Sequence, residues 1–75
     1  MISYKPLLKL LIDKNLKKIN LVSAGVLSSA TMAKIDKGEY ISFSVLDKLC
    51  GYLKCQPSDI LKHITEDNNY NNDII

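Results

Sequence analysis

The stretch that decides the fold is KINLVSAGVLSSATMAKIDKG, which spans residues 18–38. Apolar side chains recur at helical spacing before and after the GVL triplet at residues 25–27. The glycine of this triplet can adopt backbone angles that other residues avoid, which suits a sharp change of direction. We therefore expect two short helices, over about residues 18–24 and 29–36, joined by a tight turn.

The second of these helices has a slim outer face. Ser28 or Ser29 is suited to cap its start, and Met32 and Ile35 form its apolar side. Its other side chains are small, polar or basic: Ser29, Ala30, Thr31, Ala33 and Lys34. A helix of this kind fits into the major groove of DNA, where side chains contact base edges. Two helices joined in this way form the helix-turn-helix pattern, which makes a DNA-binding regulator the leading interpretation.

Three further helices are expected outside this stretch. A broad leucine face predicts a helix over about residues 4–14, in which Pro6 fits only in the first turn. Ser42 is a good N-cap for a helix over about residues 43–53. Pro57 suits the first turn of a fifth helix, and no alternating apolar pattern indicates a strand. The expected fold class is therefore all-α, with five helices.

The last ten residues, EDNNYNNDII, differ in character from the rest. They are rich in asparagine and acids and have no helical period. We therefore expect one domain over residues 1–65 and a disordered acidic tail over residues 66–75. The two terminal isoleucines leave two interpretations open, a weak docking peptide or an end without a partner.

The charge of the chain is distributed unevenly. Residues 1–65 hold all ten lysines and five acids, a formal charge of +5, whereas residues 66–75 hold three acids and a charge of −3. A basic domain suits a phosphate-rich partner, although a solvated lysine surface explains the same count. The chain contains no arginine, the side chain that most often contacts guanine. Either lysine takes that part, or the site is A·T-rich and is recognised through methyl contacts and shape.

Length and hydropathy exclude several classes of protein. Seventy-five residues suffice for one small domain. The longest mostly apolar run, residues 7–12, is far shorter than the roughly 20 residues of a membrane span. The first residues lack the long apolar region and the cleavage site of a signal peptide. We therefore expect a cytoplasmic protein that does not contact a membrane.

Neither a metal site nor an active site is expected. Cys50 and Cys55 are best explained as structural residues, because a cytosolic disulfide is rare and a zinc site needs about four ligands. His63 is the only histidine, and no serine–base pair, carboxylate pair or glycine-rich phosphate loop accompanies it. We expect no enzyme activity, no cofactor and no small-molecule ligand.

The chain resembles the Cro and phage-repressor type of helix-turn-helix regulator, also called the xenobiotic-response-element family. Within that family it is most similar to small stand-alone regulators of Gram-positive bacteria. Four segments carry the resemblance, which covers residues 3–61: the opening SYKPLLKLLIDK, the LSSAT segment, the KGE turn and CQPSDI. The resemblance implies a compact five-helix domain of the lambda-repressor-like type, with residues 29–36 in the major groove. It also implies repression of its own or adjacent genes and dimers on half-sites about 34 Å apart.

The same resemblance assigns candidate DNA contacts. Five residues fall where the family contacts bases and flanking phosphates: Ser28, Ser29, Ala30, Thr31 and Lys34. Three lysines lie where phosphate contacts are expected: Lys17, Lys18 and Lys37. These residue types suit the chemistry, since hydroxyls serve either base type, methyl groups touch thymine and lysine reaches guanine. For Thr31 a second interpretation stays open, in which the side chain turns inward and packs.

Two features of this segment leave alternatives open. Lys17 and Lys18 place cations at the positive end of a helix dipole, either because a phosphate binds there or because the helix start is frayed. The family usually has glycine where Val26 stands, one residue after Gly25. Either Gly25 takes the left-handed conformation or Val26 is strained. Strain at Val26 predicts that a Val26→Gly variant is more stable.

The alternative function is a protein-interaction module, such as an antitoxin or adaptor, built on the same fold. The fifth helix or the tail would dock onto the partner, whereas a dimer is expected to form through the fifth helix and the end of the fourth. Three aromatic residues could be core, interface or simply exposed: Tyr40, Phe43 and Tyr52. DNA binding is expected to weaken steeply with salt, which distinguishes the two functions.

Overall fold

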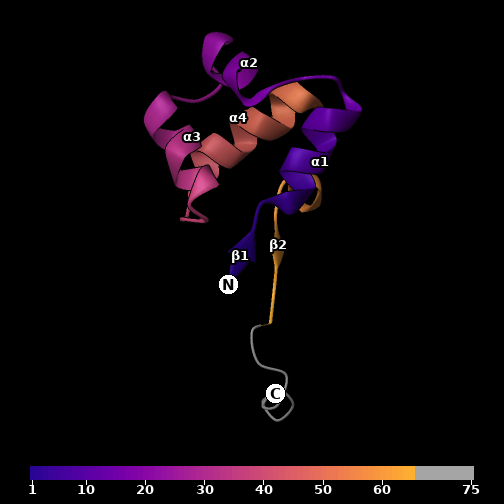
Figure 1. Ribbon diagram of the computed structural model, residues 1–75, viewed down its shortest axis with the longest axis vertical. Helices are drawn as coiled ribbons and strands as arrows, with labels where there is room; N and C mark the ends of the chain where they lie inside the picture. Colours follow the sequence, from indigo (N-terminus) through magenta and orange to yellow (C-terminus); the bar gives the residue numbers. More distant parts are fainter. Residues whose placement is uncertain (66–75) are drawn as a thin grey trace.

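The computed structural model describes residues 1–65 of the chain. Its elements in chain order are β1 (Ile2–Ser3), α1 (Lys5–Asp13), α2 (Lys18–Ser23), α3 (Ser29–Asp36), α4 (Phe43–Leu53), the 3₁₀ turn η1 (Pro57–Asp59) and β2 (Lys62–His63). Helix α4 runs through the middle of the molecule, with α3 on one side and α1 on the other (Figure 1). Strands β1 and β2 lie side by side next to the start of α1 (Figure 1).

The helix-turn-helix forms where the sequence predicts it. Helix α3 has the predicted bounds, and α2 ends one residue earlier than predicted. The hydroxyl of Ser28 caps α3, because its Oγ accepts a hydrogen bond from the backbone N–H of Thr31 at 3.1 Å. After α3, Gly38 adopts a φ of +77°, the left-handed conformation that ends many helices.

The turn between α2 and α3 depends on Gly25. Its φ is +77°, whereas Val26 has no positive φ, which decides between the two alternatives for the turn. The backbone N–H groups of Gly25 and Val26 donate to the carbonyls of Val22 and Leu21, each at 3.0 Å. The Val26 side chain is buried and belongs to the hydrophobic core. The premise of a strained valine is therefore wrong, and Val26→Gly is not expected to stabilise the protein.

We expect Gly25→Ala to destabilise the fold by about 1–2 kcal/mol, the cost of placing a Cβ in the left-handed conformation. A Cβ at Gly25 would meet no atom within 4 Å, so the cost is conformational and not steric. Gly51 is the matched control, because it lies inside α4 and also has free space around it. Gly51→Ala is expected to stabilise by about 1 kcal/mol. Thermal unfolding followed by circular dichroism measures both, and equal shifts for the two variants would contradict this account of the turn.

Helix α4 begins and ends as its sequence predicts. Ser42 caps its start, because its Oγ accepts from the backbone N–H of Val45 at 3.1 Å. The helix ends after Leu53, where Lys54 takes a φ of +54°. Asn15 likewise ends α1 with a φ of +59°, in agreement with the tolerance of asparagine for this conformation.

The predicted fifth helix is wrong. Residues Pro57–Asp59 form a single 3₁₀ turn, in which Asp59 Oδ2 accepts from the backbone N–H of Gln56 at 3.0 Å. Ile60 follows with its side chain fully buried, and its carbonyl accepts a hydrogen bond from the backbone N–H of Leu7 at 3.1 Å. Because this carbonyl is bonded to α1, the backbone leaves the helical path after one turn.

The chain continues from that turn into a short antiparallel pairing. In it Ile2 lies opposite His63 and Ser3 opposite Lys62. The all-α prediction is therefore corrected: residues 1–65 form a mostly helical fold with four α-helices and one two-stranded sheet. The predicted tail over residues 66–75 lies outside the described residues.

The core joins the helix-turn-helix to the rest of the molecule. Five side chains are completely or almost completely buried: Leu7, Leu21, Leu49, Leu53 and Ile60. They come from α1, α2, α4 and the residue after η1, and they belong to one cluster with Met32 and Ile35 of α3. Each such side chain contributes about 1.5–3 kcal/mol of hydrophobic free energy when it is buried, which holds the helix-turn-helix in one orientation.

Three aromatic residues remain outside this core. Tyr40 and Phe43 are 76% and 86% exposed, and Tyr52 is also exposed. These exposed fractions exclude a position in the core for the three aromatic side chains, and they leave an interface or a solvent-exposed position. The dimer surface that was expected on a fifth helix is not present as predicted, because residues 57–59 form a 3₁₀ turn.

None of the four α-helices in residues 1–65 has the length and hydropathy of a membrane-spanning segment.

Candidate nucleic-acid interface

Helix α3 presents small side chains to solvent along its first turns and charged side chains toward its end. Met32 and Ile35 are buried and Thr31 is half-buried, so one side of the helix faces the core. The exposed side chains on and just after α3 are Ser29, Ala30, Ala33, Lys34, Asp36 and Lys37. Two alanines in the middle of this surface allow a close approach to a groove wall, while the lysines can reach beyond it.

Ala33 belongs to this surface although it is absent from the predicted contacts. It lies three residues after Ala30 and four after Ser29, which places the three side chains on one face of the helix. Its exposure agrees with that placement. The signal was present in the helical period alone, since any residue that shares a face with two predicted base contacts is a candidate for a third.

Ser28 and Thr31 are bonded to each other at the start of α3. The Ser28 Oγ accepts from the Thr31 backbone N–H and donates to Thr31 Oγ1, both at 3.1 Å. Thr31 is also half-buried, as the packing alternative for this residue requires. Both side chains therefore hold the first turn of α3. For the predicted base contacts, Ser28 retains one acceptor position, whereas Thr31 retains its O–H donor and one acceptor position.

A side-chain hydrogen bond closes the start of α2. The Lys17 backbone N–H donates to Asn20 Oδ1 at 2.7 Å, so one of the unpaired donors at this helix end is satisfied by a side chain. The Lys17 and Lys18 side chains are both exposed. A frayed start is therefore not needed to explain two lysines at this position. Among the described residues Lys17 forms no ion pair and is available to a phosphate group, whereas Lys18 would have to exchange a carboxylate partner for the phosphate.

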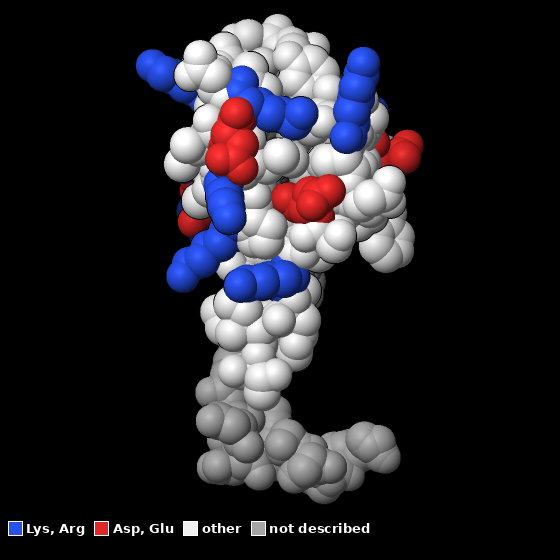
Figure 2. Space-filling view, turned by 90° about the vertical axis from the view of Figure 1, so that its right-hand side faces the viewer, with Lys and Arg blue, Asp and Glu red and all other residues white. Residues whose placement is uncertain are grey.

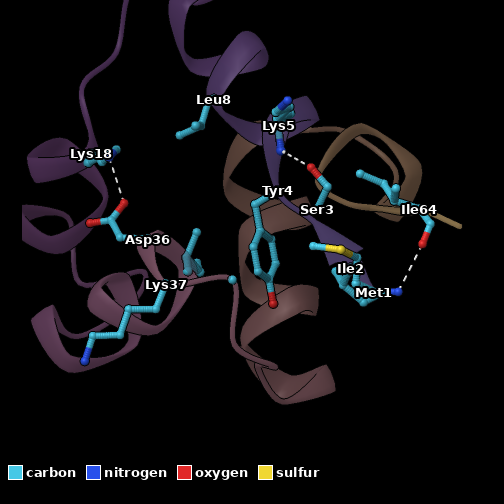
Figure 3. A pocket seen from close by; sticks show the side chains of 12 residues that line it. Met1, Ile2, Ser3, Tyr4, Lys5, Leu8, Lys18, Asp36, Lys37 and Ile64 are labelled. Atoms are coloured by element: carbon cyan, nitrogen blue, oxygen red, sulfur yellow. Dashed lines mark hydrogen bonds and ion pairs between the residues drawn. The ribbon is translucent and has the colours of Figure 1, made fainter. Parts of the chain in front are cut away.

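An ion pair joins the beginning of α2 to the end of α3. Lys18 Nζ lies 2.7 Å from Asp36 Oδ1, and the two side chains are each 46% exposed. The pair forms one edge of a cleft of about 430 Å³ between β1 and the end of α3 (Figure 3). Asp36 points toward Lys18, whereas Lys37 points away from the pair (Figure 3). The sequence did not predict this contact, because eighteen residues separate its partners and no local pattern links them.

The opposite wall of this cleft holds the loop after α3 in place. The Tyr4 hydroxyl donates to the Glu39 carbonyl at 2.6 Å, which ties the residue before α1 to the residue after Gly38. Burial is the main cause that raises the pKa of this hydroxyl above its ordinary value, so it remains a donor at neutral pH. The end of α3 and Lys37 are therefore fixed relative to α1.

The helix-turn-helix carries positive side chains, and its only carboxylate, Asp36, is paired with a lysine. Residues 17–37 hold four lysines and one acid, a formal charge of +3. The single acid is Asp36, and its charge is offset by Lys18. On the side of the molecule where α1 lies, lysines and acids are intermingled (Figure 2). The helix-turn-helix is therefore the better candidate for a phosphate-binding surface.

Removing the carboxylate at Asp36 tests what the ion pair does. We expect Asp36→Asn to raise DNA affinity a few-fold and to steepen the salt dependence by about one unit, because Lys18 is then free to neutralise a phosphate. The folding free energy should change by less than about 1 kcal/mol, since exposed ion pairs contribute little. Asp47→Asn on α4 is the control for the lost charge. A lower affinity for Asp36→Asn would mean that the carboxylate positions Lys18 for DNA.

The two cysteines meet where α4 ends. Both are half-buried free thiols, and the Cys55 backbone N–H donates to the Cys50 carbonyl at 3.1 Å. Burial, with a smaller contribution from Cys50, raises the pKa of the Cys55 thiol to about 11. Such a thiol is a poor nucleophile and metal ligand at neutral pH. Within residues 1–65 no group of three or more His, Cys, Asp or Glu side chains is arranged to hold a metal ion.

The raised pKa of Cys55 makes a prediction about alkaline pH. Because the folded state favours the neutral thiol, its contribution to stability is complete below about pH 9 and is lost as the pH rises to about 11. The difference in unfolding free energy between the wild type and Cys55→Ala should therefore shrink over this range. Urea unfolding at pH 7, 9 and 11 measures it, and a difference that is constant with pH would contradict the assignment.

The comparisons with known proteins agree with this geometry. The Cro/C1-type HTH DNA-binding domain family matches residues 6–66. The crystal structure of the transcriptional regulator VanUg (Form II) is similar to this chain, with a TM-score of 0.81 and 43% sequence identity over 87% of each chain. None of the curated proteins matches the chain. The protein belongs to the Cro/C1-type helix-turn-helix DNA-binding domain family.

Proposed function

We propose that this protein is a sequence-specific transcriptional regulator that inserts α3 into the major groove of DNA. The observation that carries the proposal is the exposed surface of α3, which combines small side chains with two lysines on a helix-turn-helix. A helix with this surface can approach base edges closely while its lysines contact the groove walls. The similarity to a transcriptional regulator supports the same function.

Each candidate contact has a part in this proposal. Lys17, Lys18 and Lys37 bind phosphates and set the register of the protein on the duplex. The residues that face the bases in this proposal are Ser28, Ser29, Ala30, Thr31 and Lys34. We add Ala33, because its side chain is exposed on the same face of α3. Without arginine, discrimination depends on lysine, on hydroxyl groups and on apolar contacts.

We further propose that the protein acts as a dimer on paired half-sites and represses transcription. Two-fold symmetry places two copies of α3 about 34 Å apart, on one face of the duplex. A single domain of this size offers few base contacts, and a second copy doubles them. Occupation of a promoter by such a dimer blocks access to it, which is the physical basis of repression. This function places the protein in the cytoplasm with the DNA, and it requires neither catalysis nor a cofactor.

A protein-interaction module is the second candidate, favoured by a different observation. Tyr40 and Phe43 are largely exposed near the start of α4, and large exposed aromatic side chains are typical of protein interfaces. Binding through these side chains would depend weakly on salt. The two functions therefore differ in a quantity that one titration measures.

The test is a binding titration of the full chain with a labelled duplex from the region upstream of its own gene. We expect affinity to fall steeply between 50 and 200 mM salt, by roughly 10³-fold or more if about six phosphates are contacted. Binding should resist a scrambled competitor of the same base composition. Analytical ultracentrifugation of the complex gives the number of copies bound. Weak binding that the scrambled duplex removes equally well would contradict the proposal.

A truncation distinguishes the second candidate from the first. Removing residues 66–75 deletes three acids and leaves all ten lysines, so DNA binding is expected to persist or to strengthen. Docking that uses this segment would be lost in the same variant.

A further inference from the structure

A shallow groove separates α2 from α3 on the outside of the helix-turn-helix. It has a volume of about 290 Å³ and is lined mainly by apolar side chains: Ile19, Val22, Met32 and Ala33, with Ser29, Lys18 and Asp36 at its edges. We call it the α2–α3 groove. Ile19 is 60% exposed, so most of its apolar surface is not used by the core of the isolated chain.

The α2–α3 groove opens onto the surface that the proposed function brings to DNA. Ser29 and Ala33 line it, and both belong to the exposed face of α3. Lys18, at the end of the groove, is a proposed phosphate contact. A duplex that meets α3 in its major groove would therefore lie against the α2–α3 groove as well.

The charges at the groove offset each other. Lys18 and Asp36 form an ion pair at 2.7 Å, so the one carboxylate near this surface is neutralised. The floor provides the side chains of Val22 and Met32 and offers no strong donor to the N7 and O6 acceptors of guanine. What the floor and Ile19 can bind well is an apolar group of small size.

In the major groove, the only apolar group that a base pair presents is the 5-methyl group of thymine. We infer that the α2–α3 groove receives a thymine methyl group, and that Ile19 and Ala33 determine specificity for thymine at one position of each half-site. This inference rests on the proposed function and deepens it. It also explains how a chain without arginine can distinguish one base pair from another, through an apolar contact with thymine.

The test uses the duplex whose bound site has been mapped by footprinting. Each thymine of the site is replaced in turn by deoxyuridine, which lacks the 5-methyl group and keeps every hydrogen-bonding group. The full-length protein is expected to bind about fourfold more weakly at one position per half-site, the ratio that corresponds to burial of one methyl-sized group. Fluorescence anisotropy at fixed salt measures each affinity.

Variants then assign that effect to the α2–α3 groove. Ile19→Ala should remove the preference for thymine over deoxyuridine at that one position and preserve the response elsewhere. Ile12→Ala is the matched control, because Ile12 is a 76% exposed isoleucine on α1, and it should keep the full ratio. Ala33→Gly should also reduce the ratio of the affinity for thymine to the affinity for deoxyuridine. Both affinities are measured on the same variant, so a change in helix stability affects both and does not change their ratio.

The outcomes separate this inference from the proposed function. Loss of the ratio in Ile19→Ala with retention in Ile12→Ala supports the groove. Specific binding to the parent duplex with equal affinity for thymine and deoxyuridine at every position overturns the groove alone. The groove inference is also overturned, and the proposed function is not, if Ile19→Ala keeps the full ratio of thymine to deoxyuridine affinity or if the mapped site contains no thymine. Absence of specific binding to the parent duplex overturns both.

Discussion

Lys34→Glu is expected to lower affinity for the specific duplex by at least about 100-fold. Lys34 is exposed on the outer face of α3, where the proposed function places it against a base edge. A lysine contact to guanine is worth about 1–3 kcal/mol of discrimination, and its loss is compounded by the repulsion between a carboxylate and the phosphates. Lys34 forms none of the ion pairs found in the described residues, so the fold should not depend on it.

The matched control is Lys9→Glu, which changes the net charge of the protein by the same amount. Lys9 is exposed on α1, and α1 and α3 lie on opposite sides of α4 (Figure 1). The DNA affinity of Lys9→Glu is expected to stay within a few-fold of the wild type, because only the long-range electrostatic field of the protein changes. Circular dichroism checks that both variants are folded. Equal losses for the two lysines would mean that binding depends on net charge and that α3 has no special part in it.

The sequence predicted best those features of the site that depend on neighbouring residues. The starts of α3 and α4 follow from Ser28 and Ser42, whose hydroxyls cap the turn that comes directly after them. The exposed face of α3 follows from its helical period. The same period places Ala33 on that face, between Ala30 and the end of the helix.

Long-range contacts account for the features that the sequence did not predict. The Lys18–Asp36 ion pair joins two helices whose relative angle is set by the core. The chain leaves the expected fifth helix because the Ile60 carbonyl bonds to Leu7, more than fifty residues earlier. Pro57 and Asp59 are good residues for a helix start, yet they form only a 3₁₀ turn. At the expected fifth helix, local preference was outweighed by a partner from a distant segment.

Val26→Gly is expected to destabilise the protein by about 3 kcal/mol. The Val26 side chain is buried in the core beside the turn, so its removal loses about 1.5–3 kcal/mol of burial free energy. Glycine adds roughly 0.5–1 kcal/mol of backbone entropy in the unfolded state. A domain of this length is stable by only about 3–10 kcal/mol. Its melting temperature should therefore fall by more than about 10 °C, which differential scanning calorimetry measures.

Val26→Ala separates the two causes of that loss, since it removes most of the side chain and keeps a Cβ. We expect it to account for the larger part of the effect, with the step from alanine to glycine adding about 1 kcal/mol. The turn also sets the angle of α3, because Val26 is bonded to α2 through its backbone N–H and packed in the core through its side chain. DNA affinity measured well below the melting temperature should consequently fall in both variants. A rise in melting temperature for Val26→Gly would mean that the turn takes its left-handed residue at position 26, and that α3 has a different orientation.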